Sequence, residues 1–186
     1  GGGASLQEHA PVPMHLFVLR ARPTHWVVDG RIAGSASLIF AGLAKAAKKT
    51  LLALHLANCV GRGWPWLGRA TAKREVIFLG FEGGDEFLAM RSLEIGYVAP
   101  REDEMSELLS VGVGMEKYEW TIAEMRRRVE VGEKWPVLVI VDTLSQVLAL
   151  RGVDENDNVK VTKFLQEHDV LAQKTGAVWF WIHHFG

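Results

Sequence analysis

Four long apolar segments, each followed by polar side chains, most strongly constrain how this chain of 186 residues can fold. They lie at residues 37–41, 75–81, 137–141 and 177–182. Nearly continuous apolar runs of this length are typical of strands in a parallel sheet that is covered on both faces. Between them, residues 48–62, 85–95, 120–131 and 159–174 have helical patterns. The alternation predicts right-handed βαβ units and an α/β fold with a mainly parallel sheet flanked by helices.

Composition excludes several classes of protein. The formal net charge of −1 is too low for a globally basic nucleic-acid binder, although a ring-shaped assembly could still gather Lys and Arg around a central channel. No apolar run approaches the roughly 18 residues that a membrane span needs. The single cysteine, Cys59, cannot form an internal disulfide, so we expect a cytoplasmic protein without a membrane partner.

The chain divides at about residue 25. Residues 1–25 contain Pro11, Pro13 and Pro23 and one short apolar piece at residues 16–19, which predicts a partly flexible arm with one strand. Residues 26–186 contain all four long apolar segments, so we expect them to form one compact domain.

The first apolar segment runs into a sequence that resembles a phosphate-binding loop. Such a loop has the pattern G-x-x-x-x-G-K-[ST], because backbone N–H groups wrap the phosphates, a lysine reaches the outer ones and a hydroxyl holds Mg²⁺. Gly42 and Lys48 fit this pattern. Ala47 replaces the second glycine, Lys49 stands at the Ser/Thr position, and Thr50 follows one place late.

These replacements leave two interpretations open. Lys49 removes the hydroxyl and puts a cation where Mg²⁺ is expected, which argues against metal binding. Thr50 supplies the hydroxyl instead if the loop is shifted by one residue. If the loop is not shifted, Lys45, Lys48 and Lys49 form a cluster that attracts phosphate at a helix N-terminus without the usual metal geometry.

Polar residues follow each of the four predicted strands. Besides the loop they are Glu82, Asp142 with Thr143, and the pair His183 and His184. In an open α/β sheet, ligands bind beyond the carboxyl ends of the strands. Since adjacent residues of a strand point to opposite faces, the two histidines are not expected to chelate one metal ion. The four groups therefore predict one active-site edge.

In order and spacing, these segments resemble a RecA-like P-loop ATPase, and their pattern is nearest to the RepA-type hexameric replicative helicases, with a degenerate Walker A loop. The resemblance covers about residues 26–186. It is carried by residues 26–30 (WVVDG), 41–50 (AGLAKAAKKT), 61–68 (GRGWPWLG), 81–86 (FEGGDE), 139–144 (VIVDTL), 152–158 (GVDENDN) and 183–186 (HHFG).

The resemblance implies a role for each matching residue. ATP would lie on the loop made by Gly42, Lys45, Ala46, Ala47, Lys48, Lys49 and Thr50. Lys48 would contact the β and γ phosphates, Asp142 with Thr50 would hold Mg²⁺, and Glu82 would polarise the attacking water. His184 or His183 would sense the γ-phosphate.

The resemblance also implies partners and alternatives. It implies single-stranded DNA as partner and a homo-oligomeric ring. In this family Arg or Lys fingers come from a neighbour, after the fourth core strand, so we expect the C-terminal part of the family's domain to be missing here. A different class of function is a degenerate RecA-fold module that binds nucleotide or DNA, or assembles oligomers, without turnover. A recombinase or clock-type ATPase of the same fold is a third reading, which residues 154–158 fit less well.

Overall fold

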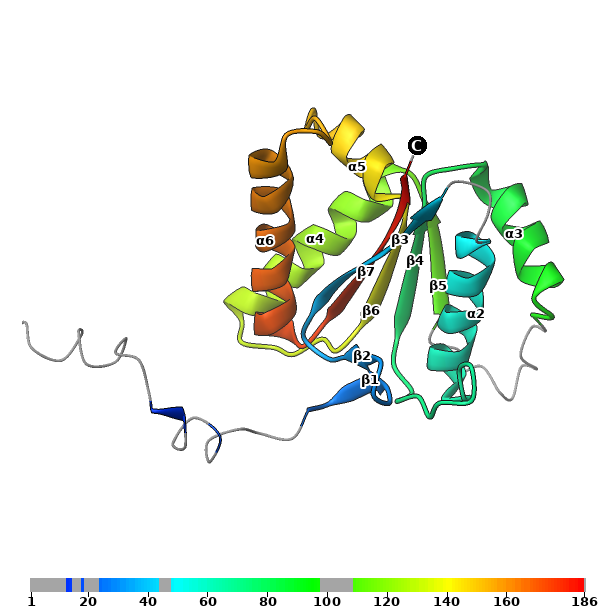
Figure 1. Cartoon of the computed structure of the whole chain (residues 1–186), viewed down its shortest axis with the longest axis horizontal. Helices are drawn as coiled ribbons and strands as arrows, with labels where there is room; N and C mark the ends of the chain where they lie inside the picture. The colour runs from blue at the N-terminus through cyan, green and yellow to red at the C-terminus, as the bar shows by residue number, and fades with distance from the viewer. Residues whose placement is uncertain (1–12, 15–17, 19–23, 44–47, 98–108, 186) are drawn as a thin grey trace, which may run out of the picture.

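The computed structural model describes residues 13–14, 18, 24–43, 48–97 and 109–185. Its centre is a sheet in which the described strands are all parallel, in the order β3 (Ser37–Leu43), β7 (Val178–Phe185), β6 (Leu138–Asp142), β4 (Val76–Gly80) and β5 (Leu109–Val113). Figure 1 shows the strands running side by side through the molecule. The pairing confirms the predicted α/β class, and it places the carboxyl ends of all these strands at one edge.

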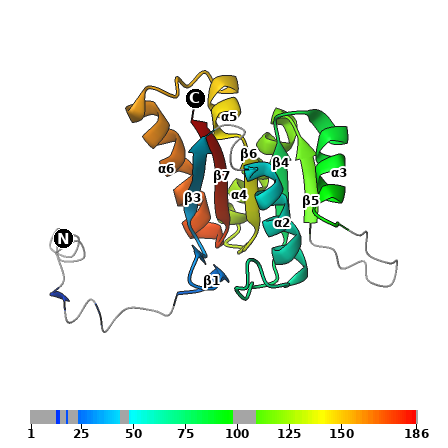
Figure 2. The same cartoon turned by 45° about the vertical axis from the view of Figure 1, so that its right-hand side comes forward.

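Helices cover both faces of the sheet. On one face lie α2 (Lys49–Arg62) and α3 (Gly84–Glu94), and on the other lie α4 (Met115–Glu130), α5 (Leu144–Leu150) and α6 (Asn158–Thr175), as Figures 1 and 2 show. Successive strand residues alternate between the two cores. Leu138, Ile140 and Phe180 pack on the α2 side. Val139 and Trp181 pack on the α4 side. Burial on both faces explains why the inner strands β4, β6 and β7 are continuously apolar.

A small antiparallel hairpin precedes the sheet. It consists of β1 (Trp26–Val28) and β2 (Ile32–Ala33), and its buried residues Val27, Val28 and Ile32 belong to the α2-side core. The hairpin begins at residue 26, where the compact domain was expected to begin. Most of the predicted arm, including nearly all of the strand expected at residues 16–19, lies outside the described residues. None of the described helices is long and apolar enough to cross a bilayer.

Two elements correct the sequence-based expectation. Strand β5 lies between the second and third predicted helices, where no strand was expected, and α5 follows the third core strand almost at once. Strand β5 is an edge strand with Ser110 and Gly112 among its five residues, so its apolar pattern is weak. Helix α5 has only seven residues, and its apolar side chains continue the run that begins in β6. Helix α4 also begins at Met115, earlier than the predicted start near residue 120.

Candidate functional site

The start of α2 meets the end of β6 at the carboxyl edge of the sheet. Lys49 is the first residue of α2, is 2% exposed, and donates a hydrogen bond from Nζ to the carbonyl oxygen of Gly42 at 2.8 Å. Thr50 donates from Oγ1 to Oδ2 of Asp142 at 2.6 Å. The structure thus brings together Gly42, Thr50 and Asp142, which the sequence predicted as parts of one site.

The helix start agrees with the loop register shifted by one residue, one of the two interpretations that the sequence left open. The hydroxyl beside Asp142 belongs to Thr50, so Lys49 does not stand in the hydroxyl's place. Lys48, one residue earlier, is exposed and has a φ of 43°, in the left-handed region that favours glycine. Lys48 therefore occupies the backbone position of the loop's second glycine. Lys45, Ala46 and Ala47 lie outside the described residues.

Among the described residues, the start of α2 has no side-chain cap, because its N-cap residue, Lys48, makes no capping bond, and the same is true of Gly83 before α3 and Gly114 before α4. By contrast, Thr143 caps α5 by accepting from the N–H of Gln146, and Asp157 caps α6 by accepting from the N–H of Lys160. A helix N-terminus whose N–H groups lack a cap attracts anions through those groups and the helix dipole.

Asp142 is a buried carboxylate with one unsatisfied oxygen. Burial raises its pKa, the hydrogen bond from Thr50 lowers it, Glu82 raises it, and His184 and Lys49 lower it. Oδ2 accepts from Thr50, but the buried Oδ1 has no hydrogen-bond partner in the part of the chain that the structure describes, and Nε2 of His184 is 3.9 Å away from it. Leaving a buried carboxylate oxygen without a partner is costly. A bound cation would satisfy it.

A cavity of about 500 Å³ opens beside these residues. It is called the strand-end cavity below, and its lining comes from α2, α3 and the ends of β4 and β7: Lys48, Lys49, Thr50, Leu51, Glu82, Phe87, Arg91 and His184. Glu82 is exposed and directly precedes Gly83, whose φ is 82°. A Cβ at Gly83 would lie 2.5 Å from the Phe87 ring, so glycine is needed for this turn.

Sequence reasoning missed Phe87 and Arg91. Arg91 lies over the Phe87 ring at 5.0 Å and forms an ion pair with Glu94 at 2.6 Å. The two residues are four apart on α3, a spacing that puts side chains on the same helix face. The four-residue spacing of Phe87 and Arg91, on the helix that follows the glycine turn after Glu82, could have identified these two residues from the sequence.

The two histidines have different environments. His184 lines the strand-end cavity and its buried Nδ1 has no hydrogen-bond partner. His183 instead shares a 3.0 Å hydrogen bond between its Nδ1 and the Ser145 hydroxyl. Among the described residues there is no group of three or more His, Cys, Asp or Glu side chains that could hold a metal ion by themselves.

The strand-end cavity combines a helix N-terminus, two lysines, a hydroxyl bonded to a buried carboxylate, and a second carboxylate at the neighbouring strand end. Such a set suits a polyphosphate with a divalent cation. A family model described as an AAA domain matches residues 4–186. Comparison with curated proteins finds no match.

Proposed function

This chain belongs to the AAA domain family of P-loop ATPases, and on that premise we propose that it binds and hydrolyses ATP with Mg²⁺ in the strand-end cavity. The hydrogen bond between Thr50 and Asp142 carries the proposal, because it joins the hydroxyl and the carboxylate that such a site needs. We further propose that the domain is the motor core of a ring-forming DNA helicase or related DNA motor.

Lys49 is the lysine that contacts the phosphates. It begins α2, and its ammonium group lies 2.8 Å from the carbonyl oxygen of Gly42, where the first strand enters the loop. When ATP binds, the ammonium group leaves this carbonyl oxygen and contacts phosphate oxygens. The N–H groups at the start of α2, which has no side-chain cap, face the same phosphates. Lys48, with its glycine-like backbone, supplies charge at the rim of the cavity.

Thr50 and Asp142 fit Mg²⁺, which prefers hard oxygen ligands and keeps several waters. The support is the buried Oδ1 of Asp142, which has no hydrogen-bond partner and lies next to the Thr50 hydroxyl. When bound, the cation would neutralise charge on the phosphate oxygens.

Glu82 positions the attacking water, and His184 senses the terminal phosphate. Glu82 is exposed at the cavity, so its carboxylate can accept a proton from water or align it. His184 stands between the cavity and Asp142, with a ring nitrogen still free to bond. It is therefore placed to respond to a phosphate on one side and to the metal site on the other.

Single-stranded DNA and a ring of identical subunits complete the proposal. The order of motifs along the chain supports it through the resemblance to RepA-type helicases, and the lone cysteine supports a cytoplasmic location. A neighbouring subunit is expected to supply the cationic fingers of the family. We therefore expect turnover to depend on assembly and to rise when single-stranded DNA is added.

Turnover of ATP with and without single-stranded DNA tests this function. We expect Lys49→Ala to lower kcat/KM at least about 100-fold, because a lysine contact to the transferred phosphate is removed. The matched control is Lys48→Ala, which removes the same charge one residue away. A loss confined to Lys48→Ala would show that the loop keeps the register expected from the sequence, and absence of both ATP binding and turnover would refute the proposal.

A second function deserves a test because two observations favour it. Lys49 already has a carbonyl partner, and Lys48 replaces the loop's glycine with a bulky residue. A module that binds nucleotide or DNA, or assembles oligomers, without hydrolysis fits both. ATP binding measured by fluorescence of a labelled nucleotide, with no phosphate release even when DNA is present, would establish this alternative.

A further inference from the structure

A second cavity lies on the other face of the sheet, between α4 and α6. It has a volume of about 340 Å³, and it shares no lining residue with the strand-end cavity. Tyr118 and Ile122 of α4, Phe164 and His168 of α6, and Val153 after α5 are among its lining residues. A volume above roughly 300 Å³ is in the range of sites for small molecules.

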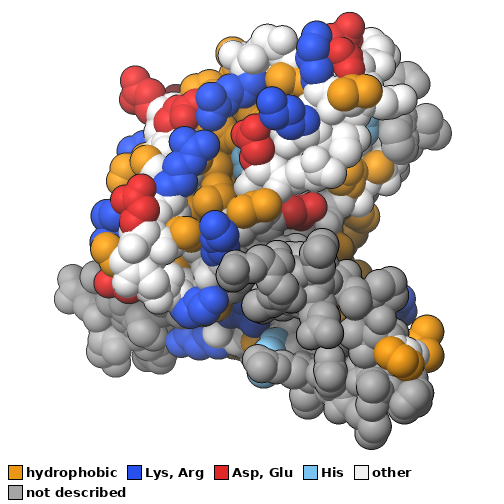
Figure 3. All heavy atoms as spheres, turned by 90° about the vertical axis from the view of Figure 1, so that its left-hand side faces the viewer, with side chains coloured by type: hydrophobic (Ala, Val, Ile, Leu, Met, Phe, Trp, Pro, Cys, Tyr) orange, Lys and Arg blue, Asp and Glu red, His pale blue; other side chains and the backbone are white. Residues whose placement is uncertain are grey.

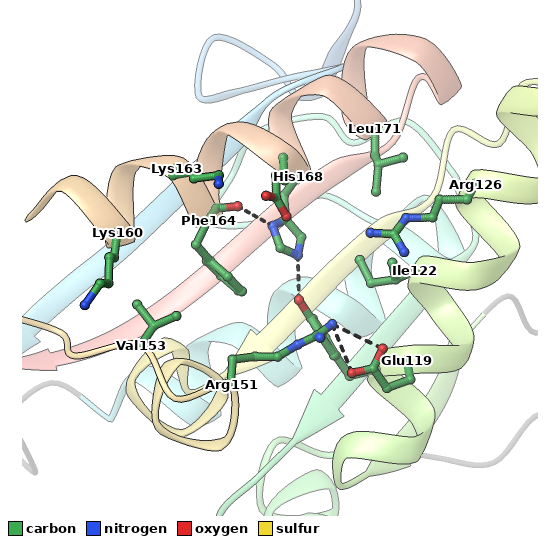
Figure 4. A pocket seen from close by; sticks show the side chains of 12 residues that line it. Glu119, Ile122, Arg126, Arg151, Val153, Lys160, Lys163, Phe164, His168 and Leu171 are labelled. Atoms are coloured by element: carbon green, nitrogen blue, oxygen red, sulfur yellow. Dashed lines mark hydrogen bonds and ion pairs between the residues drawn. The ribbon is translucent and has the colours of Figure 1, made fainter. Parts of the chain in front are cut away.

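The floor of this cavity is a closed hydrogen-bond network. Nδ1 of His168 lies 2.7 Å from the carbonyl oxygen of Phe164, so this nitrogen carries the proton and donates. Nε2 therefore accepts from the hydroxyl of Tyr118, at 2.6 Å. Figure 4 shows this chain of bonds beneath the cavity. Both ring nitrogens of His168 are thus paired, and since Tyr118 is 0% and His168 4% exposed, the two residues support the cavity from below.

Charged side chains lie at the rim of this cavity. Arg126, Arg151, Lys160 and Lys163 line the cavity, against the two carboxylates of Glu119 and Glu167. Arg151 pairs with Glu119 at 2.9 Å and Lys160 pairs with Asp157 at 3.1 Å. Figure 3 shows Lys and Arg side chains, with Asp and Glu between them, around exposed apolar groups on this side of the molecule.

The described residues of the rim include two cations and one carboxylate, Glu167, that form no ion pair. Within the described part of the chain, neither Arg126 nor Lys163 is in an ion pair. In Figure 4 Arg126 extends from α4 toward His168, while Lys163 stands on α6 on the other side of the cavity. The pKa of His168 is lowered to about 4, mainly by burial. The hydrogen bond to Phe164 opposes this shift, and the charges of Arg151 and Arg126 add to it, so their positive potential reaches the floor.

We propose that this cavity is a second ligand site, which binds a small molecule carrying a phosphate group on an apolar or aromatic body. Arg126 and Lys163 hold the phosphate from opposite helices, since guanidinium and ammonium groups form strong charge-assisted hydrogen bonds with phosphate oxygens. The apolar body lies against Ile122, Val153 and Phe164. The carboxylates of Glu119 and Glu167 at the rim disfavour a long polyanion such as DNA.

The experiment is an NMR titration of the protein with phenyl phosphate, read on the imidazole signals of His168. We expect a saturable shift of these signals. Inorganic phosphate should bind more weakly because it lacks the apolar body, and benzyl alcohol should bind more weakly because it lacks the charge. The double variant Arg126→Gln/Lys163→Gln should bind phenyl phosphate at least about tenfold more weakly, since each lost contact is a charge-assisted hydrogen bond.

The matched control is Arg127→Gln/Lys174→Gln, which makes the same two changes on the same helices outside the cavity. It should bind phenyl phosphate as the unchanged protein does. No shift of His168, or an equal loss in both double variants, would overturn the site. Equal affinity for inorganic phosphate would overturn the ligand class, and a His168 shift caused only by a single-stranded oligonucleotide would replace the small molecule with nucleic acid.

Discussion

The two cavities differ in whether the buried polar atoms beside them have hydrogen-bond partners. At the strand ends, Oδ1 of Asp142 and Nδ1 of His184 are buried without hydrogen-bond partners. Between α4 and α6, both ring nitrogens of His168 are bonded within the protein. Unpaired buried polar atoms cost stability. Nε1 of Trp66 and Nε1 of Trp179, which packs on His168, are also unpaired among the described residues, so what distinguishes the strand ends is an unpaired carboxylate oxygen beside a cavity. The paired network instead holds two helices together.

The pKa values of Asp142 and His168 are shifted by the same physical cause, but only one of the two shifts can be reversed by a cation. Burial raises the pKa of Asp142 and lowers that of His168, so in each place the fold disfavours the charged form. At Asp142 a cation could reverse this effect. His168 has no such partner within the network, because the nearby charges are the arginines 126 and 151.

The largest expected effect is on catalysis. Glu82→Gln removes the carboxylate that faces the strand-end cavity while keeping its size, so we expect kcat for ATP to fall at least about 100-fold with little change in nucleotide affinity. Steady-state turnover and equilibrium binding are measured on the same preparation. Glu86→Gln, a nearby exposed residue of α3 outside the cavity lining, is the control. Unchanged turnover in Glu82→Gln would remove Glu82 from the mechanism.

The next largest expected effect is on stability, and it comes from the hydrogen bonds that join Tyr118 of α4 to His168 of α6. Tyr118→Phe leaves Nε2 of His168 buried without a donor, so we expect a loss of about 1–3 kcal/mol in the free energy of unfolding. Urea denaturation measures the change. Glu119→Gln is the control, because it breaks only the exposed pair with Arg151 and should cost less than about 1 kcal/mol. ATP affinity should be the same in both variants.

The pH dependence of stability sharpens the comparison further. His168 has a pKa of about 4 in the folded protein, against an ordinary value of 6.5, so the unfolded chain binds more protons between these values. Stability is therefore lost as pH falls from 6.5 toward 4, and lowering the pH from 7.5 to 5.5 should cost about 1.4 kcal/mol. Asp142, whose pKa is raised, acts in the opposite sense.

Comparison with His168→Gln isolates this contribution, because glutamine does not titrate. Urea denaturation of both proteins at pH 7.5 and 5.5 should show a smaller loss in the variant. An equal loss would mean that His168 does not carry the acid sensitivity.

The smallest expected effect concerns the loop backbone. Lys48→Gly should relieve the left-handed conformation at φ 43°, while glycine adds freedom to the unfolded chain, so the net change in stability should stay within about 1 kcal/mol. Unchanged or tighter ATP binding, measured by calorimetry, would agree with the shifted loop. A loss of binding as large as that in Lys49→Ala would return the phosphate-contacting role to Lys48.

Much of the architecture followed from the sequence because the strands are buried on both faces. The long apolar runs that predicted β4, β6 and β7 reflect that burial directly, whereas β3 lies at a sheet edge and Ile39 on it is 50% exposed. Strand β5 was missed because an edge strand with serine and glycine lacks this pattern. Helix α5 was missed because its apolar residues continue those of β6 with only Asp142 and Thr143 between them.

The sequence predicted most residues of the candidate site, but it did not decide which lysine of the loop takes which position. Asp142, Glu82 and the histidines could be identified because each follows an apolar run. Choosing between Lys48 and Lys49 needed the start of α2, since adjacent lysines are equivalent in a sequence pattern but face different surroundings on a helix. Phe87 and Arg91 reach the cavity only because α3 packs beside α2.

The sequence by itself determined the class of fold and the residue types gathered at one sheet edge, because hydrophobic periodicity is local and the alternation of strands with helices implies a parallel sheet. Only the tertiary structure decided which lysine is buried, which oxygen of Asp142 is left unpaired, and that Tyr118 meets His168. These are contacts between segments up to 92 residues apart, such as Thr50 and Asp142, and packing geometry alone sets them.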